Sequence, residues 1–397
     1  MNRKTRSLSK IAMHHVGGRW GNRPFPTLPH FEADFVVVLY EADTDAIAGI
    51  REACADQPAE LIVLPFCLAA ADSEAELQVY VNPGLTSLRR LGTTLRNRYL
   101  HLFGVDFDFG EAGTGLLERR NVKTHALDNV IAAQAPDCPA PDFLSLDVQG
   151  SEYEVLLGAE KALRDAVCGL IVEVEFAEMY VGQKRFQDIC DLLAERGFDF
   201  VRFVSIGEAS GPAAPLGFRL GGYQSWADAL FLRRPDTLAR HPEAADKLGK
   251  LCFMAIVFGN IELAIDCVER LQGVAPSPAP APASPLAYQA LVSSLGQLYA
   301  RAEKVWSPVF SQILPAHRSF DYARAPGTEQ WPEIFEGLRA FDDAYRRCLE
   351  MLQRTEDSEF EALLRRYGLS EQADRVNYTR RHQANGIFQA IKAARQA

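Results

Sequence analysis

Residues 141–163 read PDFLSLDVQGSEYEVLLGAEKAL, and this stretch decides the fold. A buried-strand signal at 143–146 leads into a segment, 151–163, whose apolar residues recur at helical spacing. Asp147 stands between the two, at the carboxyl end of the strand, and Gly150 permits the tight turn into the helix. Because open α/β sheets bind ligands beyond the carboxyl ends of their strands, we predict a functional role for Asp147.

Alternating strand and helix signals extend from this stretch in both directions. We predict strands at 11–16, 35–40, 61–64, 77–81 (an edge segment), 143–146, 170–174, 198–204 and 227–232. We predict helices at 45–55, 151–163 and 186–196. Strands that alternate with helices form right-handed crossovers and a mainly parallel sheet. No helix separates the last two strands, so one of them is expected to run antiparallel.

The strand signals fade after residue 235, and the remainder is predicted to be helical. Helical spacing recurs at 245–272, 286–305, 334–352 and 360–367, and a proline/alanine linker occupies 275–285. We therefore predict an α/β domain over 1–240 and a helical C-terminal domain over 241–397. Residues 251–271 faintly resemble one tetratricopeptide-like hairpin, but without a second copy we predict no repeat array.

Composition narrows the possible functions. The chain of 397 residues carries a formal net charge of −10, whereas nucleic-acid binders need concentrated positive charge, so we predict no nucleic-acid partner. Its eight cysteines are scattered and lack the spacing of zinc ligands, which favours reduced thiols. The basic N-terminal residues are followed by no apolar core, and no apolar stretch could span a membrane. We therefore predict a soluble, cytoplasmic protein.

A glycine-rich loop follows the first predicted strand. It contains Gly17, Gly18 and Gly21, which would let the backbone approach a ligand closely. Glu41 ends the most hydrophobic strand of the chain, 20 residues after Gly21, where an acid can accept hydrogen bonds from ribose hydroxyls. The alternative, that Glu41 is a solvated acid capping the next helix, has equal weight on sequence alone.

Further acids follow the strands in the middle of the chain. Glu173 and Glu175 lie on one face of a strand, where they could act as a general base, bind a metal or form structural ion pairs. Ser151 and Glu154 have the spacing of a capping box, which is a structural role. The role of Glu152 stays open.

The chain resembles the FkbM-type methyltransferase family. The resemblance is specific from 122 to 203, in the segments 122–130, 141–163 and 170–203, and looser before that, in 64–81 and 82–90. It covers about 1–235. It implies a class I methyltransferase fold, a Rossmann-like, mostly parallel sheet with an antiparallel last strand. It also implies S-adenosylmethionine as the cofactor.

The resemblance also implies roles for individual residues. The three loop glycines would approach the methionine part of the cofactor, and Glu41 would hold its ribose. Leu68 and Ala69 would border the adenine, and Asp147 would lie beside the sulfonium and the acceptor. Asp147 or Glu175 would then take the proton of the acceptor, and no metal is predicted.

The predicted activity is O-methylation of a sugar or of a small hydroxylated metabolite, so the partner is a small-molecule or glycan acceptor. A rival hypothesis is a non-catalytic binding module, because His14, His15 and Val16 stand where the family usually has an acid. A third hypothesis is a nucleotide-sugar or NAD enzyme. The C-terminal helices could bind a protein partner or self-associate.

Overall fold

A computed structural model gives the fold of the protein. It describes residues 10–17, 25–43, 46–54, 58–92, 101–102, 114–210, 223–274, 286–301 and 359–378. The chain divides into two compact units, 1–292 and 293–397. The helices of residues 244–273 therefore belong to the same unit as the sheets, and the predicted domain boundary at residue 240 stays a prediction.

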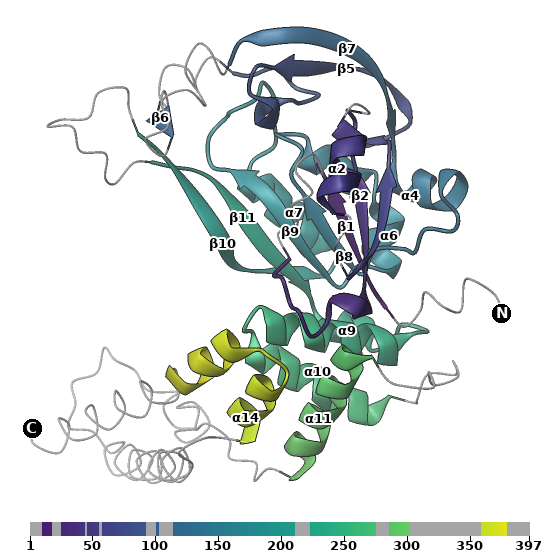
Figure 1. The fold of residues 1–397 in the computed structure, drawn as a ribbon, viewed down its shortest axis with the longest axis vertical. Helices are drawn as coiled ribbons and strands as arrows, with labels where there is room; N and C mark the ends of the chain where they lie inside the picture. Colours follow the sequence, from purple (N-terminus) through teal and green to yellow (C-terminus); the bar gives the residue numbers. More distant parts are fainter. Residues whose placement is uncertain are drawn as a thin grey trace, which may run out of the picture. The chain divides into compact units, whose positions relative to one another are not determined.

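The larger sheet has the strand order β3-β2-β1-β8-β9-β11-β10-β6 (Figure 1). Its strands are β1 (Ile11–Val16), β2 (Phe35–Tyr40), β3 (Glu60–Leu64), β6 (His101–Leu102), β8 (Phe143–Leu146), β9 (Gly169–Glu175), β10 (Phe198–Ser210) and β11 (Tyr223–Arg233). The central strands β1, β2 and β8 are buried along their whole length, as their uninterrupted apolar runs predict.

Strand direction changes only on one side of this sheet. β1 pairs in parallel with β2 and with β8, and β9 pairs in parallel with β8. β11 runs antiparallel to both of its long neighbours, β9 and β10. The predicted mostly parallel sheet with an antiparallel last strand is therefore confirmed. The chain leaves β1 toward β2 and later returns to β8 on the other side, which creates a topological switch point between β1 and β8.

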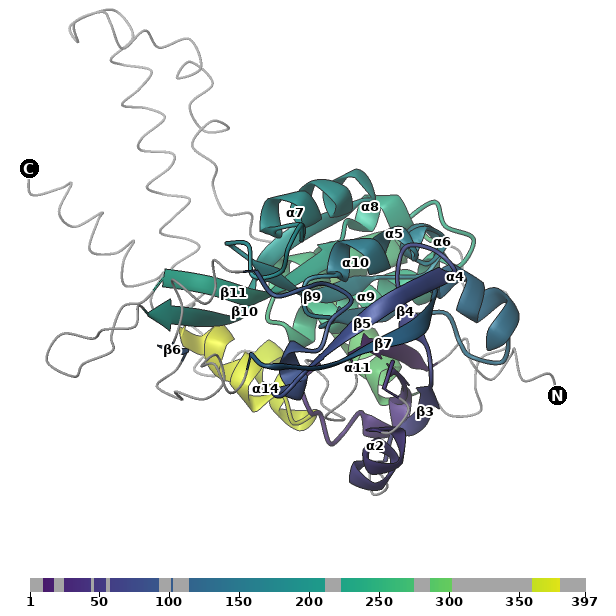
Figure 2. The ribbon, with the colours of Figure 1, turned by 90° about the horizontal axis from the view of Figure 1, so that it is seen from above.

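A second, smaller sheet has the order β4-β7-β5, with β4 (Cys67–Leu68), β5 (Ser73–Tyr80) and β7 (Leu116–His125). Figure 2 shows β5 and β7 side by side. The strand predicted at 77–81 is thus present but starts earlier, and it belongs to this sheet instead of the edge of the main one.

Helices α5 (Glu152–Leu157), α6 (Glu160–Asp165) and α7 (Phe186–Glu195) cover one face of the main sheet, and their apolar side chains form one core cluster with residues of its strands. The prediction of one helix over 151–163 is wrong. Gly158 lies so close to another segment that a Cβ would stand 2.1 Å from the Ala69 carbonyl oxygen. The Asp128 carboxylate then accepts the N–H groups of Lys161 and Ala162 and so starts a new helix.

Helix α9 (Ala244–Val257) is buried on nearly all sides and covers the amino-terminal ends of the parallel strands (Figure 1). Its Phe253 ring lies 6.2 Å from that of Phe35, the first residue of β2. Its Met254 sulfur would be 3.3 Å from a Cβ on Gly169, the first residue of β9. α9 thus closes the end of the sheet.

The remaining described helices are α2 (Ile47–Ala53), α4 (Leu127–Asn129), α8 (Pro235–Leu238), α10 (Ile261–Gly273), α11 (Ala287–Arg301) and α14 (Glu359–Arg366). The segment 245–272 forms a hairpin of α9 and α10 that turns at Gly259, where φ is +71°. The predicted linker 275–285 and the helix at 334–352 lie outside the described residues. None of the helices in the described ranges has the length and apolar character that crossing a bilayer requires.

Candidate functional site

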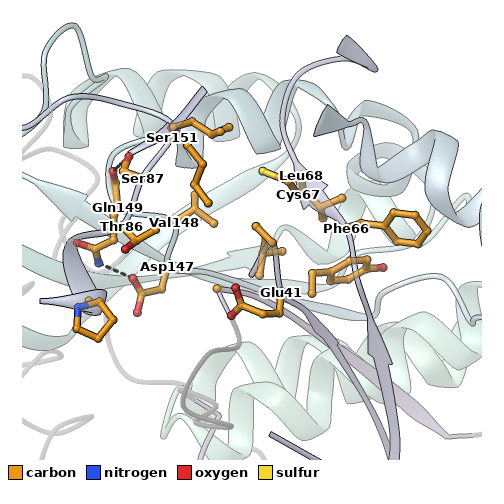
Figure 3. Close-up of a pocket in the computed structure, with 18 residues that line it drawn as sticks. Glu41, Phe66, Cys67, Leu68, Thr86, Ser87, Asp147, Val148, Gln149 and Ser151 are labelled. Carbon is orange, nitrogen blue, oxygen red and sulfur yellow. Dashed lines mark hydrogen bonds between the residues drawn. The ribbon is translucent and has the colours of Figure 1, made fainter. Parts of the chain in front are cut away.

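A pocket opens at the switch point, beyond the carboxyl ends of β1, β2 and β8 (Figure 3). It is lined by Val16, Gly17, Tyr40, Glu41, Ala42, Phe66, Cys67, Leu68, Leu77, Pro83, Gly84, Thr86, Ser87, Leu88, Asp147, Val148, Gln149 and Ser151. Figure 3 shows Glu41, which follows β2, and Asp147, which follows β8, with Phe66 and Leu68 to one side and Thr86 and Gln149 to the other. The wall is therefore acidic at the strand ends and apolar beside Glu41.

Gly17 ends β1 where the backbone of β8 passes closest. Its φ is +99°, and a Cβ built on it would lie 1.8 Å from the carbonyl oxygen of Asp147. Its N–H donates to the Tyr40 carbonyl at 3.2 Å, which ties β1 to the end of β2. Only glycine fits this crossing, because any side chain would push the strand ends apart.

Glu41 leaves β2 at the edge of the pocket. Its side chain is only 7% exposed, and its Oε1 accepts the N–H of Asp43 at 2.7 Å. Asp43 in turn accepts from the Arg120 guanidinium at 3.0 Å. Glu41 is therefore not a solvated helix cap: it is buried, and the N-cap of α2, Ala46, has no side-chain hydrogen bond. The carboxylate holds the turn after β2, and the same side chain lines the pocket.

Asp147 ends β8 and is linked to the next strand through Gln149. The Gln149 amide nitrogen donates to Asp147 Oδ1 at 2.7 Å, drawn as a dashed line in Figure 3, and to Glu173 Oε2 at 2.9 Å. Burial and the nearby Asp147 raise the pKa of Glu173 well above its usual value. Asp147 and Glu173, at the carboxyl ends of β8 and β9, are thus joined through the Gln149 amide.

Residues 32–200 match the family model of the methyltransferase FkbM domain. This segment is an FkbM methyltransferase domain. It begins before β2 and ends in β10, so it contains the pocket residues from Tyr40 to Ser151. No curated protein and no solved structure matches the chain. The match supports methyltransferase activity in general.

Of the other residues predicted to bind the cofactor, one lines the pocket, one does not, and two lie outside the described residues. Leu68 lines the pocket from β4. Ala69 is not among the lining residues, because its N–H binds the His125 carbonyl at 2.9 Å and its own carbonyl faces Gly158. Gly18 and Gly21 lie outside the described residues. Their predicted roles, like those of Gly17, Glu41 and Asp147, remain proposals.

Glu175 ends β9 next to the FkbM pocket but does not line it. Its side chain is 2% exposed, and burial together with the nearby Glu152 and Asp147 raises its pKa well above the usual value. Its predicted part in proton transfer stays a prediction. Within the described ranges, no three His, Cys, Asp or Glu side chains are grouped so that they could hold a metal ion.

His14 and His15, which replace the acid usual in the family, lie inside the sheet. His14 is fully buried with its Nδ1 3.0 Å from the Tyr40 hydroxyl, and burial lowers its pKa to about 4. His15 Nδ1 lies 2.8 Å from the Ser145 hydroxyl. Both rings are buried and hydrogen-bonded to side chains of the neighbouring strands β2 and β8, which is a structural role.

Glu152 supports the turn that carries Gln149. Its Oε1 accepts the N–H groups of Val148 at 2.8 Å and Gly150 at 3.2 Å. The predicted capping box is wrong: the Ser151 side chain caps no N–H, and Glu154 instead pairs with Arg89 at 2.5 Å. The Glu152 carboxylate instead binds N–H groups of the turn that precedes the helix.

Glu152→Gln is expected to stabilise the protein in alkaline solution. Burial raises the pKa of Glu152 from 4.5 to about 7, so the folded state resists the ionisation that the unfolded chain allows. The free energy of unfolding of the wild type should therefore fall as pH rises from about 4.5 to about 7, and the amide variant should escape this loss. Urea unfolding at pH 5 and pH 8 measures the difference. An equal difference between the two proteins at both pH values would contradict it.

Sequence reasoning missed several lining residues of the FkbM pocket. Thr86 and Ser87 come from the loop after β5, which reaches the pocket because Gln78 and Ser87 pair backbone to backbone. Gln149 stood inside the quoted motif, but only its contact with Glu173 on the next strand reveals its importance. In the sequence, the one indication of a role for Gln149 was its place between Asp147 and the turn glycine Gly150.

Proposed function

We propose that this protein transfers a methyl group from S-adenosylmethionine to a hydroxyl group of a sugar or of a small hydroxylated metabolite. The observation that carries the proposal is the single pocket that joins Gly17, Glu41 and Asp147 at the switch point of the sheet. This is where open α/β sheets bind nucleotide-like ligands. The FkbM match supports the same chemistry.

The residues present fit the cofactor. Gly17 lines the pocket and carries no side chain, so a ligand could approach its backbone there. The buried carboxylate of Glu41 suits the two ribose hydroxyls, and Phe66 and Leu68 offer an apolar wall for a purine. When bound, the cofactor supplies an electrophilic methyl group on a positively charged sulfur.

Asp147 has the position expected of the group that meets the acceptor. In the proposed reaction the acceptor oxygen forms a bond to the methyl carbon, and the carbon–sulfur bond breaks with its electron pair moving to sulfur. The hydroxyl proton passes to the Asp147 carboxylate. Most of the rate gain would come from holding the acceptor oxygen in line with the carbon–sulfur bond.

Glu41→Ala is expected to weaken binding of S-adenosylmethionine by at least about 1 kcal/mol, roughly fivefold in Kd, because the ribose would lose its charged hydrogen-bond partner. Isothermal calorimetry measures the affinity. Glu41→Gln keeps an acceptor for Asp43 and should show a smaller loss. Glu74→Ala removes an exposed glutamate of β5 and serves as the control. Equal affinity of wild type and Glu41→Ala would refute the ribose assignment.

A test of the activity itself starts from the wild-type protein. Incubation with S-adenosylmethionine carrying a labelled methyl group, together with mono- and oligosaccharide acceptors, should yield labelled product and S-adenosylhomocysteine. A thermal-shift comparison with NAD should show stabilisation by S-adenosylmethionine only, since a ligand stabilises the fold that binds it. Stabilisation by NAD alone, or by neither ligand, would overturn the proposal and favour one of the rival hypotheses.

A further inference from the structure

Gln149 has an unusual backbone conformation at the wall of the pocket. Its φ is +58°, and within the described ranges it is the one non-glycine residue in the left-handed region. Such a conformation is strained for a residue with a side chain, and it persists only where surrounding contacts impose it. The contacts of Gln149 show what that conformation provides.

The Gln149 amide binds two carboxyl groups at once. Its nitrogen donates to Asp147 Oδ1 at 2.7 Å and to Glu173 Oε2 at 2.9 Å, so both N–H bonds are used. Asp147 adds to burial in raising the pKa of the Glu173 carboxyl. Two carboxyl groups that bind the same amide nitrogen lie close to each other, and their mutual repulsion favours a proton on Glu173.

Three neighbours fix the direction of the amide. The Tyr180 hydroxyl donates to Gln149 Oε1 at 2.8 Å, which turns the nitrogen toward the acids. Gly150 makes room for the tyrosine, because a Cβ there would lie 2.7 Å from the Tyr180 ring. The Ser87 hydroxyl donates to the Gln149 carbonyl at 2.7 Å and holds the backbone.

We propose that Gln149 is a positioning residue that holds the Asp147 and Glu173 carboxyls as one proton-sharing pair at the wall of the pocket. The inference rests on the proposed function, because the proposed methyl transfer is the reaction in which the pair would accept a proton. The pair presents one negative charge beside the place proposed for the sulfonium. When Asp147 accepts the proton of the acceptor hydroxyl, the pair becomes neutral, and Gln149 keeps both carboxyls in place.

Other charged and titratable groups face this pair from the surrounding elements. They are His15 on β1, Arg89 after β5, Glu152 on α5, Glu175 on β9, Tyr180 after β9 and Asp228 on β11. The acids among them add negative potential, which favours the protonated form of Glu173. Arg89 is engaged by Glu154, so it does not neutralise the pair.

The first test measures the shared proton without any ligand. An infrared spectrum of the wild type at neutral pH should contain carbonyl bands of protonated carboxyls, to which Glu152 and Glu175 also contribute. The difference spectrum between wild type and Glu173→Gln should isolate the band of Glu173. In Gln149→Leu the band should persist to higher pH, because the lost N–H donors had favoured the ionised form. Gln187→Leu is the matched control, since the Gln187 amide donates to the Asp191 carboxylate at 2.9 Å on exposed α7.

The second test compares a charged with a neutral ligand. Calorimetry would give the ratio of the Kd for S-adenosylhomocysteine to that for S-adenosylmethionine, between pH 5.5 and pH 9. Gln149→Leu should lower this ratio about threefold or more, because Asp147 is no longer held toward the sulfonium. Gln149→Glu keeps the shape of the side chain but adds an acid, so its ratio should rise with pH. A merely structural role would not shift the two variants in opposite directions.

The outcomes separate the inference from the proposed function. If both Gln149 variants have the same Kd ratio and the same infrared titration as the wild type and Gln187→Leu, the inference about Gln149 is wrong. The proposed methyl transfer is unaffected by that result. If wild type binds neither ligand, the proposed function is wrong, and the infrared titration alone decides whether the pair exists. Should Gln149→Leu fail to fold, Gln149→Glu supplies both readouts.

Discussion

Alanine in place of Gly17 is expected to lower the free energy of unfolding by about 3 kcal/mol and to abolish measurable binding of S-adenosylmethionine. The added Cβ would stand 1.8 Å from the Asp147 carbonyl oxygen, and the residue would have to keep a φ of +99°. A backbone atom cannot rotate away as a side chain can, so the ends of β1 and β8 must separate. This displacement would move Asp147 as well.

Gly49→Ala is the matched control for this substitution. Gly49 lies in α2, where nothing is within 4 Å of an added Cβ, so alanine should be neutral or stabilising by up to about 1 kcal/mol. Urea unfolding gives the stabilities, and calorimetry gives the affinities. A Gly17→Ala protein that binds the cofactor as wild type does would show that the crossing at Gly17 is not part of the site.

Asp142→Asn is expected to destabilise the protein by about 3–5 kcal/mol, because it leaves two buried ammonium groups without their common partner. Asp142 lies just before β8 and is 3% exposed. Its carboxylate binds Lys247 Nζ at 2.8 Å and Lys250 Nζ at 2.9 Å, both from α9. The remaining acid at this cluster, Asp246, lies 3.0 Å from Lys250 only.

The pH dependence of this cluster has a definite sign. The two lysines lower the pKa of Asp142 below its usual 3.8, so its contribution to stability is fully present above that value. The contribution is lost as pH falls through the lower pKa of the folded state. The gap in unfolding free energy between wild type and Asp142→Asn should therefore be large at pH 7 and shrink in strong acid.

Asp199→Asn provides the control, because it removes an exposed ion pair with Arg234 at 3.3 Å. Exposed pairs contribute less than about 1 kcal/mol, so this variant should unfold at nearly the wild-type urea concentration. A loss from Asp142→Asn no larger than that from Asp199→Asn would mean that the buried cluster does not hold α9 to the sheet.

The strands were predictable because their apolar runs are local and continuous. The run 35–40 and the run 143–146 both form fully buried strands, and the acids that follow them, Glu41 and Asp147, line one pocket. Parallel strands bring their carboxyl ends to one edge, so residues that end such strands meet even when 106 positions separate them. This part of the site follows from pattern alone.

The rest depends on contacts between distant segments. The break at Gly158 arises from Ala69, and the start of α6 depends on Asp128, neither of which is a local signal. Asp142 and Lys247 are 105 positions apart in the sequence. The sequence of α9 alone therefore does not indicate that this helix closes the end of the sheet. The partners of Gln149 likewise become visible only when β8 and β9 are placed side by side.

β1 is part of the folded sheet but lies outside the segment that the family model matches. β1 lies in the middle of the sheet, hydrogen-bonded to β2 on one side and β8 on the other. The recognisable family segment, 32–200, contains neither β1 nor β11 nor α9. If that segment were excised, it would lack the central strand of the sheet. The boundaries of the family match therefore differ from those of the folded sheet in this chain.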